Sequence, residues 1–136
     1  MPALQKHAIF TLIVASAALV AFAARAVVLG LARSFAAFAI LSLWALSGMF
    51  YRKRMRGGEV ASVYDERDRQ IQQRANTVTF GVLWVIFVAA GMGVWFGYGD
   101  GGKIPASFLP IAVSLGAAIL LETWAIAILW QYYRQG

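Results

Sequence analysis

One acidic residue of this chain, Glu122, lies inside a long apolar run with the sequence Leu120-Leu-Glu-Thr-Trp-Ala125. In a hydrocarbon layer an ionised carboxylate costs on the order of several kcal/mol unless it is paired or hydrated. Glu122 could therefore be a proton or cation site, or a structural acid hydrogen-bonded between helices and fixing their register. Side chains near its expected depth could donate to it, namely the indoles of Trp44, Trp84 and Trp124 and the hydroxyls of Ser42 and Ser47.

A second chemically rich segment is SVYDERDRQIQQRAN, residues 62–76, which holds six charged residues within an otherwise apolar chain. Ser62 can cap the start of a helix, and the acidic residues follow it in the opening turns. Arg69 and Arg74 come later, as the helix dipole prefers. The order of charges therefore predicts a helix.

The spacing of this segment predicts one helix face that continues into the following apolar run. The members of that face recur at intervals of three, four or seven: Tyr64, Asp68, Ile71, Ala75, Val78 and Val82. A single rod over residues 62–98 would be about 55 Å long. The alternative is a bend near residues 76–77, which would lay the amphipathic part along the membrane surface.

Two interpretations of the charged segment remain open. It is either a solvated, helix-capping face or a surface that binds a protein partner or a second subunit. The candidate partner-binding residues are Tyr64, Asp65, Glu66, Arg67, Asp68, Ile71 and Ala75.

The pattern Asp65-Glu-Arg-Asp-x-x-Ile71-x-x-x-Ala75, just before an apolar run, resembles the signature of a family of uncharacterised small four-span membrane proteins of bacteria and archaea. In that family a similar segment occupies the central cytoplasmic loop. Members are often encoded beside helix-turn-helix regulators, so the resemblance implies a membrane partner for a transcriptional regulator. The match covers about eleven residues and the span layout, and the motif names no chemistry.

Other candidate residues have simpler interpretations. The basic run Arg52, Lys53, Arg54 and Arg56 would retain its loop in the cytoplasm and contact anionic lipid headgroups, at about 1 kcal/mol per basic residue. His7 is the only histidine, so metal or haem ligation lacks partners, and we expect it to face solvent at the interface. Gly93-x-x-x-Gly97 permits close helix approach, either inside the bundle or between two copies.

Composition indicates the class of protein that positions these residues. Of 136 residues, 61% are hydrophobic and 13% charged, about half the charged fraction of a typical soluble domain, roughly 25%. The net charge of +6 accompanies apolar runs, which favours membrane topology and anionic lipid over direct nucleic-acid binding. No cysteine is present, so disulfide, thiolate and zinc–cysteine chemistry are excluded.

The apolar runs predict an all-α, integral membrane four-helix bundle in one domain, residues 1–136. The expected spans are residues 8–30, 34–51, 77–98 and 107–133, with a cytoplasmic loop at 52–76. The first run resembles a signal peptide ending near Ala21-Phe-Ala23, but its length favours an uncleaved helix.

The distribution of Lys and Arg predicts the orientation. Nine of them fall on the side of the central loop, whereas Arg25, Arg33 and Lys103 fall on the other. We therefore expect both termini in the cytoplasm and the chain in the inner membrane.

The sequence lacks a catalytic triad, paired catalytic carboxylates and any cofactor motif, so we expect no enzyme, metal or cofactor. The leading hypothesis is a membrane protein whose segment 65–75 docks a partner. A small proton-coupled transporter working through Glu122 and an accessory subunit of a larger membrane complex are the alternatives.

Overall fold

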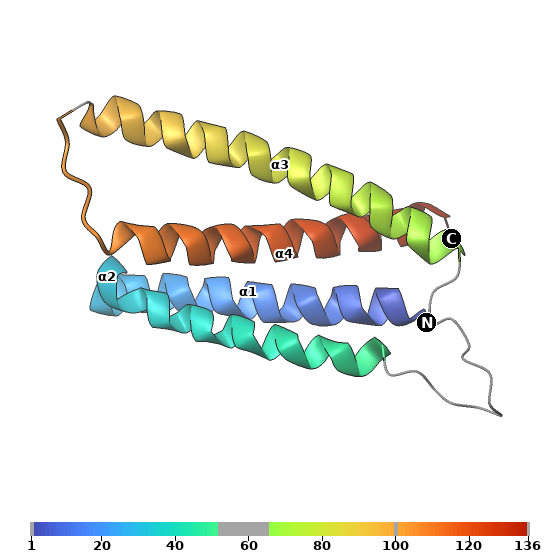
Figure 1. The fold of residues 1–136 in the computed structure, drawn as a ribbon. Helices are drawn as coiled ribbons and strands as arrows, with labels where there is room; N and C mark the ends of the chain where they lie inside the picture. The colour runs from blue at the N-terminus through green and yellow to red at the C-terminus, as the bar shows by residue number, and fades with distance from the viewer. Residues whose placement is uncertain (1, 52–65, 100, 136) are drawn as a thin grey trace.

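The computed structural model describes residues 2–51, 66–99 and 101–135, and the described chain is all-α, as predicted. The described helices form four rods, which lie lengthwise beside one another in Figure 1. The second rod begins as a short α-helix and continues as a 3₁₀ helix. The elements are α1 (Ala3–Leu29), α2 (Leu31–Ser34), the 3₁₀ helix η1 (Phe35–Tyr51), α3 (Glu66–Tyr98) and α4 (Phe108–Gln135).

Three of these helices, α1, α3 and α4, are long and apolar enough to cross a membrane, and η1 carries a shorter apolar stretch, Phe35–Ser47. The helices extend beyond the predicted spans at the end where the two termini lie. α1 begins at Ala3 instead of residue 8, and α3 begins at Glu66, before the span predicted from residue 77 but within the rod predicted over residues 62–98. The charged segment from Glu66 and the apolar run after it are therefore one 33-residue helix, which confirms the predicted rod over this range.

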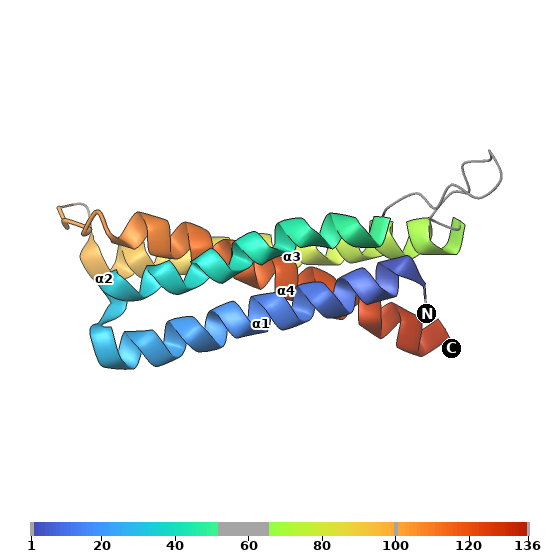
Figure 2. The same ribbon diagram turned by 90° about the horizontal axis from the view of Figure 1, so that it is seen from below.

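The 3₁₀ geometry of η1 lengthens the second rod. Its 17 residues extend about 34 Å at a rise of about 2.0 Å each, whereas an α-helix of equal length would reach only about 26 Å. The rod therefore runs the length of α1, beside it in Figure 2. Because a 3₁₀ helix repeats every three residues, Phe38, Leu41, Trp44 and Ser47 share one face.

A tight turn at Gly30 joins the first two rods. Gly30 has φ 78° and ψ 161°, a backbone conformation that is essentially restricted to glycine. Its N–H donates to the Ala26 carbonyl at 3.2 Å, and the Ser34 hydroxyl donates to the Gly30 carbonyl at 2.7 Å. These bonds satisfy backbone groups at the helix ends and fix the reversal.

Packing is centred on α1, which contacts both η1 and α4, while α3 packs chiefly on α4. Figures 1 and 2 show both chain termini at one end of the bundle. The core has two parts. One joins α1, α3 and α4 through Leu4, Ala8, Ile71, Ala75, Ala125, Ile128 and Tyr132, and the other joins α1, η1 and α4 through Ala18, Phe38 and Ala118. Phe22 and Phe38 stack in the second part with ring centroids 4.8 Å apart.

The later half of α3 diverges from α4 in Figure 1 and exposes large apolar side chains, among them Phe87 at 71% and Phe96 at 77%. Such a surface suits lipid. A Cβ built on Gly91, Gly93 or Gly97 would meet nothing within 4 Å, so these glycines do not serve close helix approach within the described part of the chain.

Candidate functional site

Glu122 is half-buried inside the bundle, where its Oε1 accepts a hydrogen bond from the Ser16 hydroxyl of α1 at 2.7 Å. The two side chains meet because α1 and α4 are antiparallel with their ends level. Ser16 is 13 residues from Ala3, and Glu122 is 13 residues from Gln135. Both therefore lie about 20 Å from the shared end of the bundle. Counting from the true helix ends could have identified Ser16, which the sequence reasoning missed.

The side chains predicted to donate to Glu122 mostly make other contacts. Trp44 Nε1 donates to Thr11 Oγ1 at 3.1 Å, and Trp124 Nε1 donates to Asn76 Oδ1 at 3.0 Å. The Ser42 hydroxyl donates to the Ala39 carbonyl of its own helix. Trp84 is 68% exposed. The prediction was wrong for these four because it placed them by depth alone, whereas helix rotation decides which way each side chain points.

His7 is buried among aromatic rings, so the prediction of a solvent-facing histidine was wrong. Its ring lies 5.1 Å from that of Trp124, edge to face, and 6.0 Å from that of Trp44. Because α1 starts five residues earlier than expected, His7 falls within the helix and next to the buried positions Leu4 and Ala8. The same two tryptophans donate to neighbouring polar side chains, Trp44 of η1 to Thr11 of α1 and Trp124 of α4 to the exposed Asn76 of α3.

The first turns of α3 pack against α4 and form hydrogen bonds with it. Asp68 is buried, and its Oδ1 accepts a hydrogen bond from the Tyr132 hydroxyl. Ile71 is 1% exposed and Ala75 is fully buried. Gln131 Nε2 donates to the Ile71 carbonyl at 3.3 Å, and the Arg67 guanidinium lies 5.9 Å from the centre of the Tyr132 ring.

The predicted continuous face of α3 is confirmed from Asp68 to Ala75, but beyond Ala75 the buried face follows other residues than predicted. Asp68, Ile71 and Ala75 are buried together, but the next buried residue is Thr79. Val78 is 52% exposed and Val82 is 38% exposed. A spacing of four keeps the buried line in contact with α4, and sequence periodicity could not choose between positions 78 and 79.

The candidate partner-binding residues thus divide by environment. Asp68, Ile71 and Ala75 pack within the chain, while Glu66 and Arg67 are exposed on the outside of the same turns. Tyr64 and Asp65 lie outside the described residues, as do Ser62 and the predicted headgroup residues Arg52, Lys53, Arg54 and Arg56.

A polar cleft of about 360 Å³ runs along the exposed side of this segment. Its described lining is entirely polar and follows one face of α3: Glu66, Arg69, Gln72, Gln73 and Asn76. The spacing of three and four residues places these side chains along one continuous strip of the helix. This polar face of α3 is the exposed side of the motif segment.

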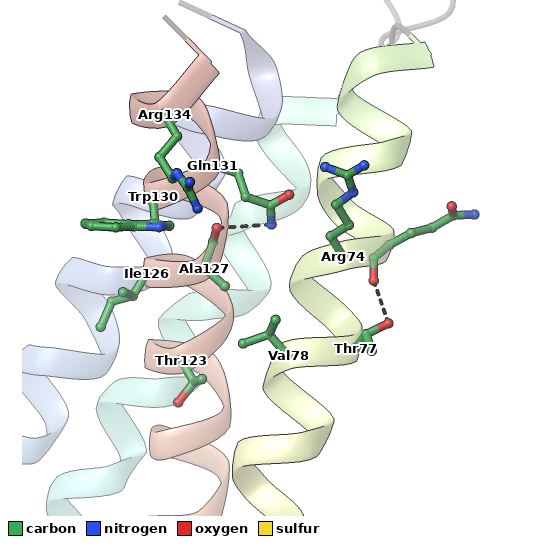
Figure 3. Close-up of a pocket in the computed structure, with 10 residues that line it drawn as sticks. Arg74, Thr77, Val78, Thr123, Ile126, Ala127, Trp130, Gln131 and Arg134 are labelled. Carbon is green, nitrogen blue, oxygen red and sulfur yellow. Dashed lines mark hydrogen bonds between the residues drawn. The ribbon is translucent and has the colours of Figure 1, made fainter.

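A larger groove of about 690 Å³ lies between α3 and α4. Figure 3 shows Arg74 of α3 and Arg134 of α4 on either side of Gln131 toward one end, with Val78 and Thr123 toward the other. Its described lining includes two cations and no acid. Glu122 does not line it.

Among the residues that the structure describes, no three His, Asp or Glu side chains are grouped as a metal site would require. The described polar groups include hydrogen bonds that join helices, a polar face on α3 and a groove lined by two arginines.

Comparison with known proteins assigns the chain to a family of membrane proteins. The family model described as "Predicted membrane protein (DUF2178)" matches residues 5–136, nearly the whole chain. The searches of curated proteins and of solved structures found no match. With three long apolar helices in the described chain and a match of this extent, the protein belongs to the DUF2178 family of multi-pass membrane proteins.

Proposed function

We propose that this chain is a non-enzymatic membrane protein that binds a protein partner, a transcriptional regulator or another subunit, through the polar face of α3. The observation that carries the proposal is the continuity of α3, a single helix from the charged segment at Glu66 to Tyr98. A partner bound at one end of a continuous helix acts on the part of that helix within the membrane.

The division of the motif supports this proposal. Asp68, Ile71 and Ala75 hold the segment on α4, so the charged face opposite them is presented in a defined orientation. Preorganised surfaces bind with a smaller loss of conformational freedom than mobile ones. Glu66 and Arg69 on that face would provide charge complementarity and partner selection.

The proposed orientation has both termini and the polar face of α3 in the cytoplasm of an inner-membrane protein, with η1 as the fourth crossing. Two observations support it. Lys and Arg are concentrated toward the central loop and termini, and both termini lie at the same end of the bundle in Figure 1.

Site-specific photocrosslinking tests the docking surface. A photoreactive amino acid would replace Arg69 on the polar face or, as a matched control on the same helix, the exposed Phe87. In native membranes we expect a discrete protein adduct at position 69 and only lipid adducts at position 87. Identical adducts at both positions, or none at position 69, would refute partner docking.

A second candidate function is proton-coupled transport through Glu122. The observation in its favour is the bond from Ser16, which positions the carboxyl inside the bundle without a cationic partner among the described residues. Proton flux into liposomes containing the purified chain is the test. Flux that Glu122→Gln leaves unchanged would remove this residue from the mechanism.

A further inference from the structure

The groove between α3 and α4 combines a basic mouth with an apolar floor. Arg74 and Arg134 come from different helices and face the same space, with the exposed Trp130 beside them. Val78 and Ile126 line the groove farther from its mouth. The two guanidinium groups repel each other across a lining that includes no described acid, and an anion between them would remove that repulsion.

The position of the groove along the helices matches the boundary of a membrane. Arg74 precedes Val78, where the apolar part of α3 begins, by four residues, or about 6 Å. Arg134 follows Trp130 by one turn near the end of α4. Tryptophan favours the interfacial zone, and arginine there meets phosphate groups. Ile126 lies two turns deeper than Arg134 on α4, at the depth of acyl chains.

From this pattern we infer that the α3–α4 groove is a binding site for an anionic phospholipid, whose phosphate pairs with Arg74 and Arg134 while an acyl chain lies against Val78 and Ile126. Guanidinium groups bind phosphate oxygens through two parallel hydrogen bonds, which gives geometric selectivity as well as attraction. The volume of about 690 Å³ suits the phosphoglycerol part and the first segment of one chain, and the rest would extend into the bilayer.

The inference is independent of the docking proposal because Arg74, Arg134 and Val78 line only the groove and Glu66 and Arg69 line only the polar face of α3. Gln73 lies at the edge between them and lines both. The inferred site also differs from the basic run at residues 52–56, since it relies on two helices that are packed together. A lipid in the groove would bridge α3 and α4 and oppose their separation.

Lipid binding to the purified full-length chain in detergent micelles tests the site by native mass spectrometry. The probes are phosphatidylglycerol and, for comparison, zwitterionic phosphatidylcholine. Arg74→Gln/Arg134→Gln is the groove variant, and Arg25→Gln/Arg33→Gln removes the same charge at the opposite end of the bundle. We expect the groove variant to bind phosphatidylglycerol about 30-fold more weakly, from two charges, while the control variant binds as wild type does.

A third variant, Val78→Trp, distinguishes a lipid from a free phosphate compound. It fills the groove at a half-exposed position and leaves both arginines in place. We expect it to reduce phosphatidylglycerol binding as well, and we expect soluble glycerol phosphate to compete poorly. Equal binding by all variants would overturn the site, as would efficient competition by glycerol phosphate with no effect of Val78→Trp. Disulfide-linked dimers formed through a cysteine introduced at position 78 would instead assign the groove to a second copy.

Discussion

The hydrogen bond between Tyr132 and Asp68 offers a sharp test of the role of the motif. Tyr132→Phe removes only the hydroxyl and keeps the ring that lies 5.9 Å from the Arg67 guanidinium. Asp68 is 6% exposed, so the variant leaves a buried carboxylate without this donor. A buried group that loses its partner costs about 1–3 kcal/mol, and a charged group costs more. We therefore expect Tyr132→Phe to destabilise the bundle by about 2 kcal/mol.

A second substitution, at Asp68, shows how much of the lost stability comes from the bond itself and how much from the two side chains separately. Asp68→Asn keeps an acceptor oxygen but removes its charge, and charge-assisted bonds are roughly twice as strong as neutral ones. We expect this variant to cost about 1 kcal/mol, half of the estimate for losing the bond. The double variant should cost less than the sum of the two single substitutions, because the bond is lost only once and no buried charge remains unpaired.

The assay is equilibrium unfolding in mixed micelles, with helix content followed as the fraction of denaturing detergent rises. Ser42→Ala is a suitable control, because Ser42 is exposed and its hydroxyl donates to the Ala39 carbonyl of its own helix. The reasoning is refuted if the two single substitutions add independently, or if Tyr132→Phe is as stable as the control. Either result would mean that Asp68 is not held by Tyr132.

Three further predictions concern other parts of the chain. Ser16→Ala should destabilise the contact of α1 with α4 by about 0.6 kcal/mol and at most about 1.7 kcal/mol, the range for interhelical bonds in membranes, measured in the same unfolding assay; no change would contradict the bond. Since the chain has no cysteine, single labels are unambiguous: an impermeant maleimide should modify Gly101→Cys but not Gln70→Cys in intact cells, and the reverse would invert the proposed orientation. Gly93→Ile should leave the stability of the monomer within about 1 kcal/mol of wild type, because nothing in the described chain lies within 4 Å of its Cβ; a large loss would show that the glycine packs closely.

Several features could be predicted because they depend on properties local to the chain. Apolar runs longer than a bilayer requires predict helices whatever their neighbours are. The continuity of α3 could be predicted because residues of one helix face recur at the same intervals of three and four in the charged segment and in the apolar run. The same reasoning placed Asp68, Ile71 and Ala75 on one helix face, which it offered as a surface for a partner, and the structure buries these three residues within the chain.

The 3₁₀ form of η1 could not be predicted in this way. An apolar run of 17 residues predicts an α-helix, because 3₁₀ runs longer than three or four residues are uncommon. In the structure, Phe38 and Trp44 repeat in multiples of three along the face that meets α1, through Phe22 and Thr11. Only the neighbour makes that repeat advantageous.

The sequence by itself determined that this protein is helical, that it belongs in a membrane, and that its charges gather before the third apolar run. The tertiary structure alone decided that Ser16 meets Glu122, that His7 is buried, and that Arg74 and Arg134 face one groove. The reason is physical. Hydropathy and helix formation are summed along the chain, whereas a contact between helices depends on the rotation and relative height of two rods, which their packing sets.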